Sequence, residues 1–330
     1  TLTFNLPNVP NPDVVIENAP TPNFTLISGS TFENTSFNGY DAVVINGGTS
    51  TDNLSFQGLN PLDIFPVTLN FDTDDIVTFE TTETNLGSED LTVNTGFLIV
   101  SADITTTGNI DFTSERNTII NNNATVSVTD GAINIEATTA PLAGDIYKGI
   151  LVENGNLLAT GTGSITMTGT GSNGGANSRT QGVFVTGTSL LQTTTGNIDI
   201  TGTGAGSGLD RLMGIRINDG AADAAVLQSV DGDIILNGTG GSGTDNFQIG
   251  VVIDGINAVQ LTGLGSLTAT GFGGTGQQAN YGISIQNTAS TINNGNIDLN
   301  GIAGNGNSNL QIGVIVGFTA SLDILGAGSV

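Results

Sequence analysis

Gly196-Asn197-Ile198-Asp199-Ile200 is the clearest copy of a five-residue segment that recurs along the chain. The copies open at Gly131, Gly163, Gly196, Gly232, Gly265 and Gly295, and the pattern starts again at Gly328. Subtracting successive glycine numbers gives 32, 33, 36, 33, 30 and 33. A fixed period in this range is typical of stacked structural repeats.

A second segment, glycine followed by apolar-x-apolar, trails the first at a constant interval. It begins at Gly149, Gly182, Gly214, Gly250, Gly282 and Gly313, and subtracting the paired glycine numbers gives 18, 19, 18, 18, 17 and 18. Both segments alternate apolar and polar residues with period two, which indicates strands and excludes helical repeats. A third, looser strand is expected around Leu157, Leu190, Val226, Val259, Ile292 and Leu322.

Three strands in each period predict an all-β fold, a right-handed parallel β-helix or solenoid with three strands per coil. The coil period is about 33 residues in the second half. Because side chains alternate between the two faces of a strand, Ile198 and Ile200 are expected to point inward and Asp199 outward. The decisive expectation is that Ile198, Ile234 and Ile297 lie along one internal stripe.

The domain organisation is predicted from the parts of the chain in which the repeat period is found. Upstream, the interval from Gly108 to Gly131 is only 23, so shorter coils are expected there. The β-helix is expected over residues 67–330, truncated at its carboxyl end inside a repeat. Residues 1–66 hold seven of the eight prolines and show no clear period. They are interpreted as an irregular β segment or cap.

Composition narrows the chemistry and the partners. The chain has 30 Asp and Glu against 5 Lys and Arg, a formal net charge of -25. This acidity argues against nucleic acid and anionic membranes as partners. No apolar run approaches the roughly 20 residues that span a bilayer, so no membrane insertion is expected. The absence of Cys and His removes thiolate catalysis and the commonest zinc ligands.

An acidic run makes calcium the candidate cofactor. Asp72 and Asp74 are expected to share a strand face, and Asp75 lies beside them. One Ca²⁺ would relieve their repulsion, since carboxylate oxygens are its preferred ligands. The alternative is a solvated acidic edge without a metal.

The outward positions of the second strand are unexpectedly apolar. Contiguous exposed apolar surface usually marks a contact site, so this column is predicted to pack laterally against another protomer or module. The alternative is that the long Gly-rich loop of each repeat folds over it. The column reads Leu151, Phe184, Arg216, Val252, Ser284 and Ile315.

Two runs carry a family resemblance: Gly108-Asn-Ile-Asp-Phe-Thr-Ser114 and Ala124-Thr-Val-Ser-Val-Thr-Asp-Gly-Ala-Ile-Asn-Ile-Glu-Ala137. Here the chain resembles filamentous-haemagglutinin-like exoproteins and related large β-strand-repeat bacterial proteins. The resemblance covers roughly residues 90–330. It implies secretion and a role in adhesion or in the cell envelope, and it transfers no catalytic residue.

The expected function is a non-catalytic extracellular or cell-surface rod that acts as an adhesin, a surface-layer protein or a filament subunit. Its expected partners are further copies of itself or surface glycans. The alternative is a carbohydrate-active β-helix enzyme, a polysaccharide lyase or glycoside hydrolase. Asp199 and Asp298 would lie about 14 Å apart, beyond the roughly 5–9.5 Å of paired glycosidase carboxylates. Asp199 and Asp233, in adjacent coils, would lie closer.

Overall fold

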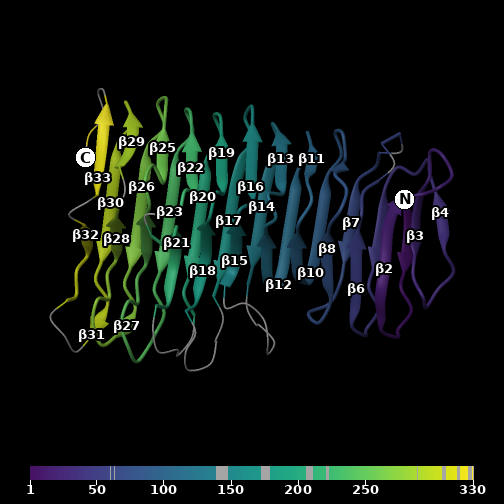
Figure 1. Cartoon of the computed structure of the whole chain (residues 1–330), viewed down its shortest axis with the longest axis horizontal. Helices are drawn as coiled ribbons and strands as arrows, with labels where there is room; N and C mark the ends of the chain where they lie inside the picture. The colour runs from purple at the N-terminus through teal and green to yellow at the C-terminus, as the bar shows by residue number, and fades with distance from the viewer. Residues whose placement is uncertain are drawn as a thin grey trace.

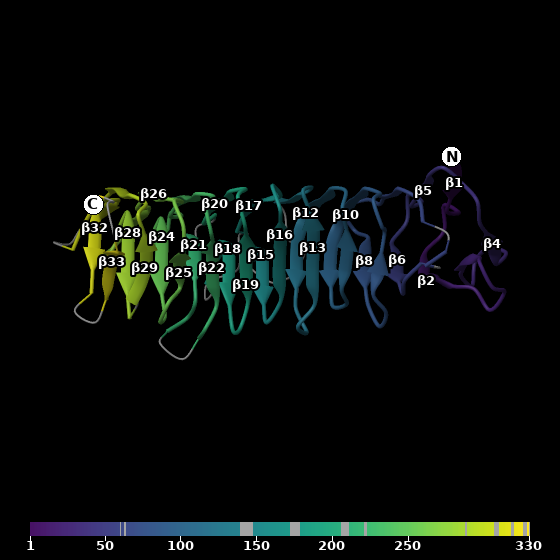
Figure 2. The ribbon, with the colours of Figure 1, turned by 90° about the horizontal axis from the view of Figure 1, so that it is seen from above.

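The computed structural model describes residues 1–59, 61–62, 64–138, 148–171, 179–205, 211–220, 223–287, 289–306, 310–317, 320–325 and 329. Within these residues the chain is all-β and contains no helix, as the sequence predicts. The strands lie side by side along one long axis, with the N-terminus at one end and the C-terminus at the other (Figures 1 and 2). Part of the C-terminal repeat, including Gly328, lies outside the described residues.

The first-motif segments form one stack of parallel strands. Ile198 pairs with Ile234, Ile234 with Leu267, and Leu267 with Ile297. All four side chains are at most 4% exposed, so the expected internal stripe is confirmed. The stack contains β1 (Leu2–Asn5), β5 (Val43–Asn46), β7 (Val67–Asn70), β10 (Leu91–Val100), β12 (Ile110–Ile120), β14 (Ala132–Ala137), β17 (Ser164–Thr170), β20 (Ile198–Thr203), β23 (Ile234–Thr239), β26 (Leu267–Phe272) and β30 (Ile297–Ile302).

The second-motif segments form another parallel stack in the same sheet. Upstream, β10 and β12 run through both stacks without an intervening loop, which accounts for the shorter spacing there. The stack contains β2 (Asn11–Asn18), β6 (Asp52–Phe56), β8 (Ile76–Phe79), the second halves of β10 and β12, β15 (Lys148–Glu153), β18 (Gln181–Thr186), β21 (Met213–Ile217), β24 (Val251–Asp254), β28 (Ile283–Gln286) and β32 (Val314–Val316).

The third strands form a separate nine-stranded parallel sheet. Leu157 pairs with Leu191 and Leu191 with Leu227. The sequence-based positions Leu190 and Val226 were therefore one residue early, and both point outward. The sheet contains β9 (Thr84–Asn85), β11 (Ile104–Thr106), β13 (Thr125–Thr129), β16 (Asn156–Thr160), β19 (Leu190–Thr193), β22 (Val226–Ser229), β25 (Val259–Leu261), β29 (Ala289–Asn293) and β33 (Ser321–Leu325).

The amino-terminal strands join these stacks across residue 66, because β5 pairs with β7 and β6 with β8. Antiparallel pairing occurs only here among the described strands: β2 pairs with β3 (Thr25–Ser28), and β3 with β4 (Thr35–Phe37). Whether residues 1–66 act as a cap stays a prediction.

The recurring glycines bring backbone against backbone. A Cβ atom on Gly196 would lie 2.0 Å from the carbonyl oxygen of Gly163, and one on Gly232 would lie 1.8 Å from that of Gly196. A second glycine, inside the strand that follows, touches the second stack: a Cβ atom on Gly202 in β20 would lie 2.3 Å from the oxygen of Gly214. Only glycine fits where two backbones approach this closely.

In three consecutive repeats the residue after the first-motif glycine links one repeat to the next. Asn197 Oδ1 accepts the backbone N–H of Asp233 at 2.9 Å, and Asp233 Oδ1 accepts that of Ser266 at 2.8 Å. Ser266 Oγ in turn accepts the N–H of Asn296 at 3.1 Å. These short polar side chains therefore satisfy backbone donors that the turn leaves outside the strand ladders.

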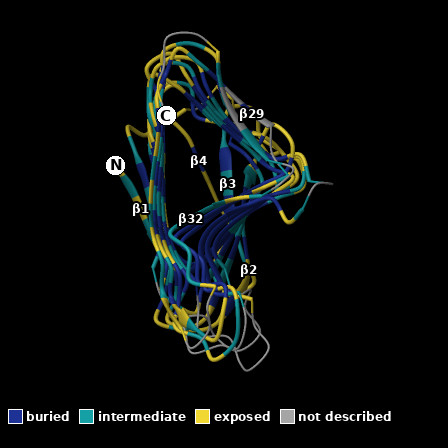
Figure 3. Cartoon of the chain, turned by 90° about the vertical axis from the view of Figure 1, so that its left-hand side faces the viewer, coloured by how far each residue is buried: buried dark blue, intermediate teal, exposed yellow. Residues whose placement is uncertain are grey.

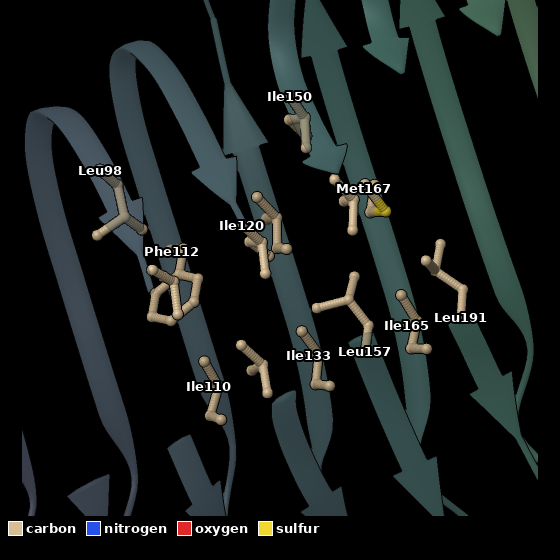
Figure 4. Close-up of a cluster of buried hydrophobic side chains, with 14 of the residues drawn as sticks. Leu98, Ile110, Phe112, Ile120, Ile133, Ile150, Leu157, Ile165, Met167 and Leu191 are labelled. Atoms are coloured by element: carbon tan, nitrogen blue, oxygen red, sulfur yellow. The ribbon is translucent and has the colours of Figure 1, made fainter. Parts of the chain in front are cut away.

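One cluster of buried apolar side chains runs from Leu6 to Ile297. In the end view the three stacks lie around this buried interior (Figure 3). Figure 4 shows how it is filled: Ile110, Ile133 and Ile165 come from successive strands of the first stack, with Leu157 and Leu191 from the third stack nearby. Each repeat thus lends apolar surface to its neighbours.

Candidate functional site

The three predicted calcium ligands lie in the turn between β7 and β8. The expectation that Asp72 and Asp74 share a strand face was wrong, because the strands end at Asn70 and resume at Ile76. Asp72 and Asp74 are exposed, whereas Asp75 is fully buried. Asp75 therefore differs from the other two carboxylates in its exposure to solvent.

The carboxylate of Asp75 accepts two hydrogen bonds from backbone N–H groups. Its Oδ1 accepts the N–H of Asp52 at 2.7 Å, and its Oδ2 accepts the N–H of Asp72 at 2.6 Å. Burial raises the pKa of Asp75 to about 6; the two hydrogen bonds oppose this rise, and the charges of Asp52 and Asp74 add to it. The carboxyl group thus accepts backbone hydrogen bonds at a buried place where loss of water contact disfavours its ionised form.

Asp52 repeats this arrangement one strand earlier. Its Oδ1 accepts both the backbone N–H of Asn11 at 3.1 Å and the Asn11 amide at 2.7 Å. Its Oδ2 accepts the N–H of Gly48 at 2.7 Å. Among the residues that the structure describes, no three Asp or Glu side chains gather so as to hold a metal ion. Calcium at Asp72, Asp74 and Asp75 stays a prediction.

The six residues of the predicted interface lie opposite one another on successive strands of the second stack, in the order given above. The expectation that this column is exposed was wrong for most of it. Leu151, Phe184, Arg216 and Val252 are 4–9% exposed, Ser284 is fully buried, and Ile315 is half-buried. A role of the column in an interface stays untested.

The face is covered by a second, smaller apolar cluster. Val252 packs there with Met213, Ile249 and Tyr281, and Ile315 packs against the same cluster. In the segments before β28 and β32, β27 (Thr275–Gly276) pairs in parallel with β31 (Asn305–Gly306). The residues shown around Val252 lie just before the second-motif glycines. That the long Gly-rich loop folds over the whole column stays a prediction.

Phe184 stands out in the column because two cations lie over its ring. Lys148 Nζ is 5.8 Å and Arg216 Cζ 5.6 Å from the ring centroid. Arg216 is 7% exposed; its Nε donates to the Asn218 carbonyl at 3.0 Å, and its guanidinium pairs with Asp219. Burial lowers the pKa of both Lys148 and Arg216.

The outer face of the first stack is mostly polar, with Ile235, Phe272 and Ile302 as apolar exceptions. Asp199 and Asp298 occupy equivalent positions three strands apart, with Ile235 and Thr268 between them. Burial raises the pKa of Asp199, whereas Asp233 is engaged by the N–H of Ser266. A shallow pocket of about 210 Å³ on this face is lined by Asp111, Phe112, Thr113, Asn134, Ile135, Glu136, Thr166 and Thr168.

Comparison with known proteins gives a simple result. No family model, curated protein or solved structure matches the chain. The described residues also contain no helix long and apolar enough to cross a membrane.

Sequence reasoning missed the cation pair on Phe184, and it gave a cover over Val252 only as an alternative, without naming the residues that form it. A signal for the cover exists, since an apolar residue directly precedes the motif glycine in four repeats, at Met213, Ile249, Tyr281 and Ile312. Lys148 holds the same place directly before Gly149. An apolar residue directly before the second-motif glycine therefore indicates the covered face, and the outward column does not.

Proposed function

We propose that the three parallel stacks are the sides of a right-handed parallel β-helix with three strands per coil. In the second half a coil takes about 33 residues. We further propose that it serves as a non-catalytic extracellular or cell-surface rod, structural or adhesive in role. An adhesin, a surface-layer protein and a filament subunit are the candidate roles.

One observation carries the proposal: equivalent residues pair repeat after repeat. The column Ile165, Ile198, Ile234, Leu267 and Ile297 is in register on five successive strands and is at most 4% exposed. Because each repeat buries its apolar side against neighbours, length is gained by stacking and not by enlarging a core. An extended object with a dry interior suits a load-bearing or spacing role.

The outer surface supports contact with sugars or with further copies of the chain. The first stack presents hydroxyl, amide and carboxylate groups, and Asn134 Nδ2 binds Asp111 Oδ1 at 2.8 Å within the shallow pocket there. Such groups match the hydroxyls of glycans. We therefore propose self-association or surface glycans as the partners.

Electron microscopy of the purified chain tests the structural role. Fibres, sheets or laterally aligned rods are the expected result, and glycan-array binding is the expected result for an adhesive role. Isolated particles that neither assemble nor bind any glycan would contradict both roles.

The rival function is a polysaccharide lyase or glycoside hydrolase, and the raised pKa of Asp199 is the observation that favours it. A panel of polysaccharides incubated with the chain, with and without calcium, separates the two. We expect no depolymerisation. Cleavage that is lost in Asp199→Asn and kept in Asp298→Asn would replace the structural proposal by the enzymatic one.

A further inference from the structure

The segments that follow β23, β26 and β30 pair with one another beyond the ends of these strands. Thr275 and Gly276 in β27 lie opposite Asn305 and Gly306 in β31, and Ser242 forms a parallel bridge with Thr275. Figure 1 shows β27 and β31 together at the lower edge of the molecule. The stacking of repeats therefore continues into these Gly-rich segments.

Hydrogen bonds hold the three segments in register. Thr275 donates its backbone N–H to the Gly241 carbonyl at 3.1 Å, and its own carbonyl accepts the N–H of Gly243 at 2.8 Å. Asn280 is fully buried, and its Nδ2 donates to the Asn305 carbonyl at 3.1 Å. The backbone of this layer is thus fixed by polar contacts.

An open hollow of about 500 Å³ lies among these segments. No described residue that lines it is charged, although the chain has 30 acidic residues. Its walls offer hydroxyl and amide groups, and the glycines leave peptide groups accessible to a ligand. The lining consists of Gly243, Thr244, Thr275, Gly276, Gln277, Asn305 and Gly306.

The polar side chains of the hollow are available to a ligand. Thr244, Thr275, Gln277 and Asn305 are all exposed. Within the described part of the chain, none of these four side chains forms a hydrogen bond or another polar contact. Their amides and hydroxyls therefore keep both donor and acceptor capacity.

Outward asparagines near the amino-terminus show the opposite arrangement. Asn46 Nδ2 donates to Asn5 Oδ1 at 2.7 Å, and Asn70 Nδ2 donates to Asn46 Oδ1 at 2.9 Å. Asn94 Nδ2 continues the row to Asn70 Oδ1 at 2.9 Å. Those amides bind one another along the stack, whereas the amides of the hollow do not.

An exposed aromatic ring lies close to the hollow. Phe272 is the last residue of β26 and is 43% exposed, and its neighbour in register, Ile302, is 49% exposed. Only Gly273 and Gly274 separate Phe272 from Thr275, so the Cα atoms of Phe272 and Thr275 are at most about 11 Å apart. A short oligosaccharide can therefore contact the ring and the hollow together.

We propose that the hollow between β27 and β31, together with Phe272, binds a neutral oligosaccharide. Hydroxyl and amide groups pair with sugar hydroxyls, and an apolar ring packs against the C–H side of a sugar. A metal ion would call for carboxylates in the lining, and an acidic sugar for Arg or Lys. The formal net charge of -25 also repels acidic sugars. The inference rests on the proposed adhesive role and adds the class of glycan and its site.

Calorimetric titration of the full chain with neutral trisaccharides of glucose, mannose and N-acetylglucosamine tests the site, with trigalacturonate as the charged comparison. Saturable binding of at least one neutral trisaccharide is expected, and no binding of trigalacturonate. Gln277→Ala and Asn305→Ala should each weaken binding about fivefold, the effect of one lost neutral hydrogen bond. Phe272→Ala should weaken it by a similar factor through loss of the ring contact.

Gln278→Ala is the matched control, because Gln278 is exposed beside Gln277 but is not among the described residues of the lining. Thermal unfolding checks that each variant is folded. Trisaccharide binding that the Gln277, Asn305 and Phe272 variants all keep at parent strength would overturn the site and leave the adhesive role intact. Binding of trigalacturonate alone would do the same. If no trisaccharide bound, the site would be overturned, and glycan-array binding would decide the adhesive role separately.

Discussion

Asp75 is a carboxyl group held away from water just before β8. Its folded pKa of about 6 lies above the ordinary value of 3.8, so its ionised form is more stable in the unfolded chain. Ionised Asp75 therefore lowers the free energy of unfolding, by about 3 kcal/mol. The penalty is full above pH 6 and disappears as the pH falls toward 4.

Asp75→Asn should remove this pH dependence, because the amide is neutral throughout. The free energy of unfolding of the variant relative to the parent should rise by up to about 3 kcal/mol between pH 4 and pH 7. Urea unfolding at one-unit pH steps measures it. Asp72→Asn, exposed in the same turn, is the control, and parallel curves for parent and Asp75→Asn would show that the assigned cause is wrong.

Gly196 leaves no room for a side chain above Gly163. Gly196→Ala should lower the free energy of unfolding by about 1–3 kcal/mol, since a Cβ atom 2.0 Å from a carbonyl oxygen forces the backbone to shift. Gly317→Ala is the comparison, because the nearest atom there is 3.5 Å away. Equal stability of the two variants, measured by thermal unfolding, would contradict the close backbone contact.

On strand β18, Phe184 belongs to an apolar column that the sequence predicts to be an interface and that the structure buries. Phe184 was predicted to face a partner, yet it is 9% exposed and carries two cations. Phe184→Asp should therefore destabilise the chain itself, by about 3 kcal/mol, through the lost packing of the ring.

The control for this substitution is Phe272→Asp on β26, because Phe272 is 43% exposed. Urea unfolding should show a large loss of stability for the first variant and little for the second. If Phe184→Asp instead kept full stability and abolished assembly, the column would be an open interface after all.

The strands differ in how well the sequence predicts them. The first two stacks were predictable because a glycine fixes each start and alternation fixes each face, as at Ile198 and Asp199. In the third stack Leu190 and Leu191 are both apolar, so alternation gives no phase and the prediction was one residue early. The interface column was found in register. Its cover was only an alternative at that stage, because the apolar residues that form it lie at single positions before the motif glycines and not in a periodic strand.

The candidate sites, like the strands, were only partly predictable from the sequence. Acidic residues near position 72 were recognisable as a cluster, but which of them is buried depends on the preceding strand, where Asp52 supplies the N–H that Asp75 accepts. The cations on Phe184 come from β15 and β21, which belong to the preceding and the following repeat. Their meeting depends on register, which only the folded chain provides.

The whole molecule carries a formal net charge of -25 with a sequence pI of about 4.1. Raising NaCl from about 10 to 150 mM shortens the screening length from roughly 30 to 8 Å. At pH 7 the melting temperature should therefore rise by on the order of a few degrees. The same titration near pH 4.1 should have little effect, and an equal rise there would exclude charge repulsion as the cause.

The stacked glycines also bear on how such a gene changes. Recombination between coding segments for Gly196 and Gly232 would delete one whole unit and place Gly163 against the former Gly232, still glycine on glycine. Unequal exchange in the other direction would duplicate it. Length in this protein therefore evolves in whole steps, whereas an exchange out of phase would put a side chain where none fits.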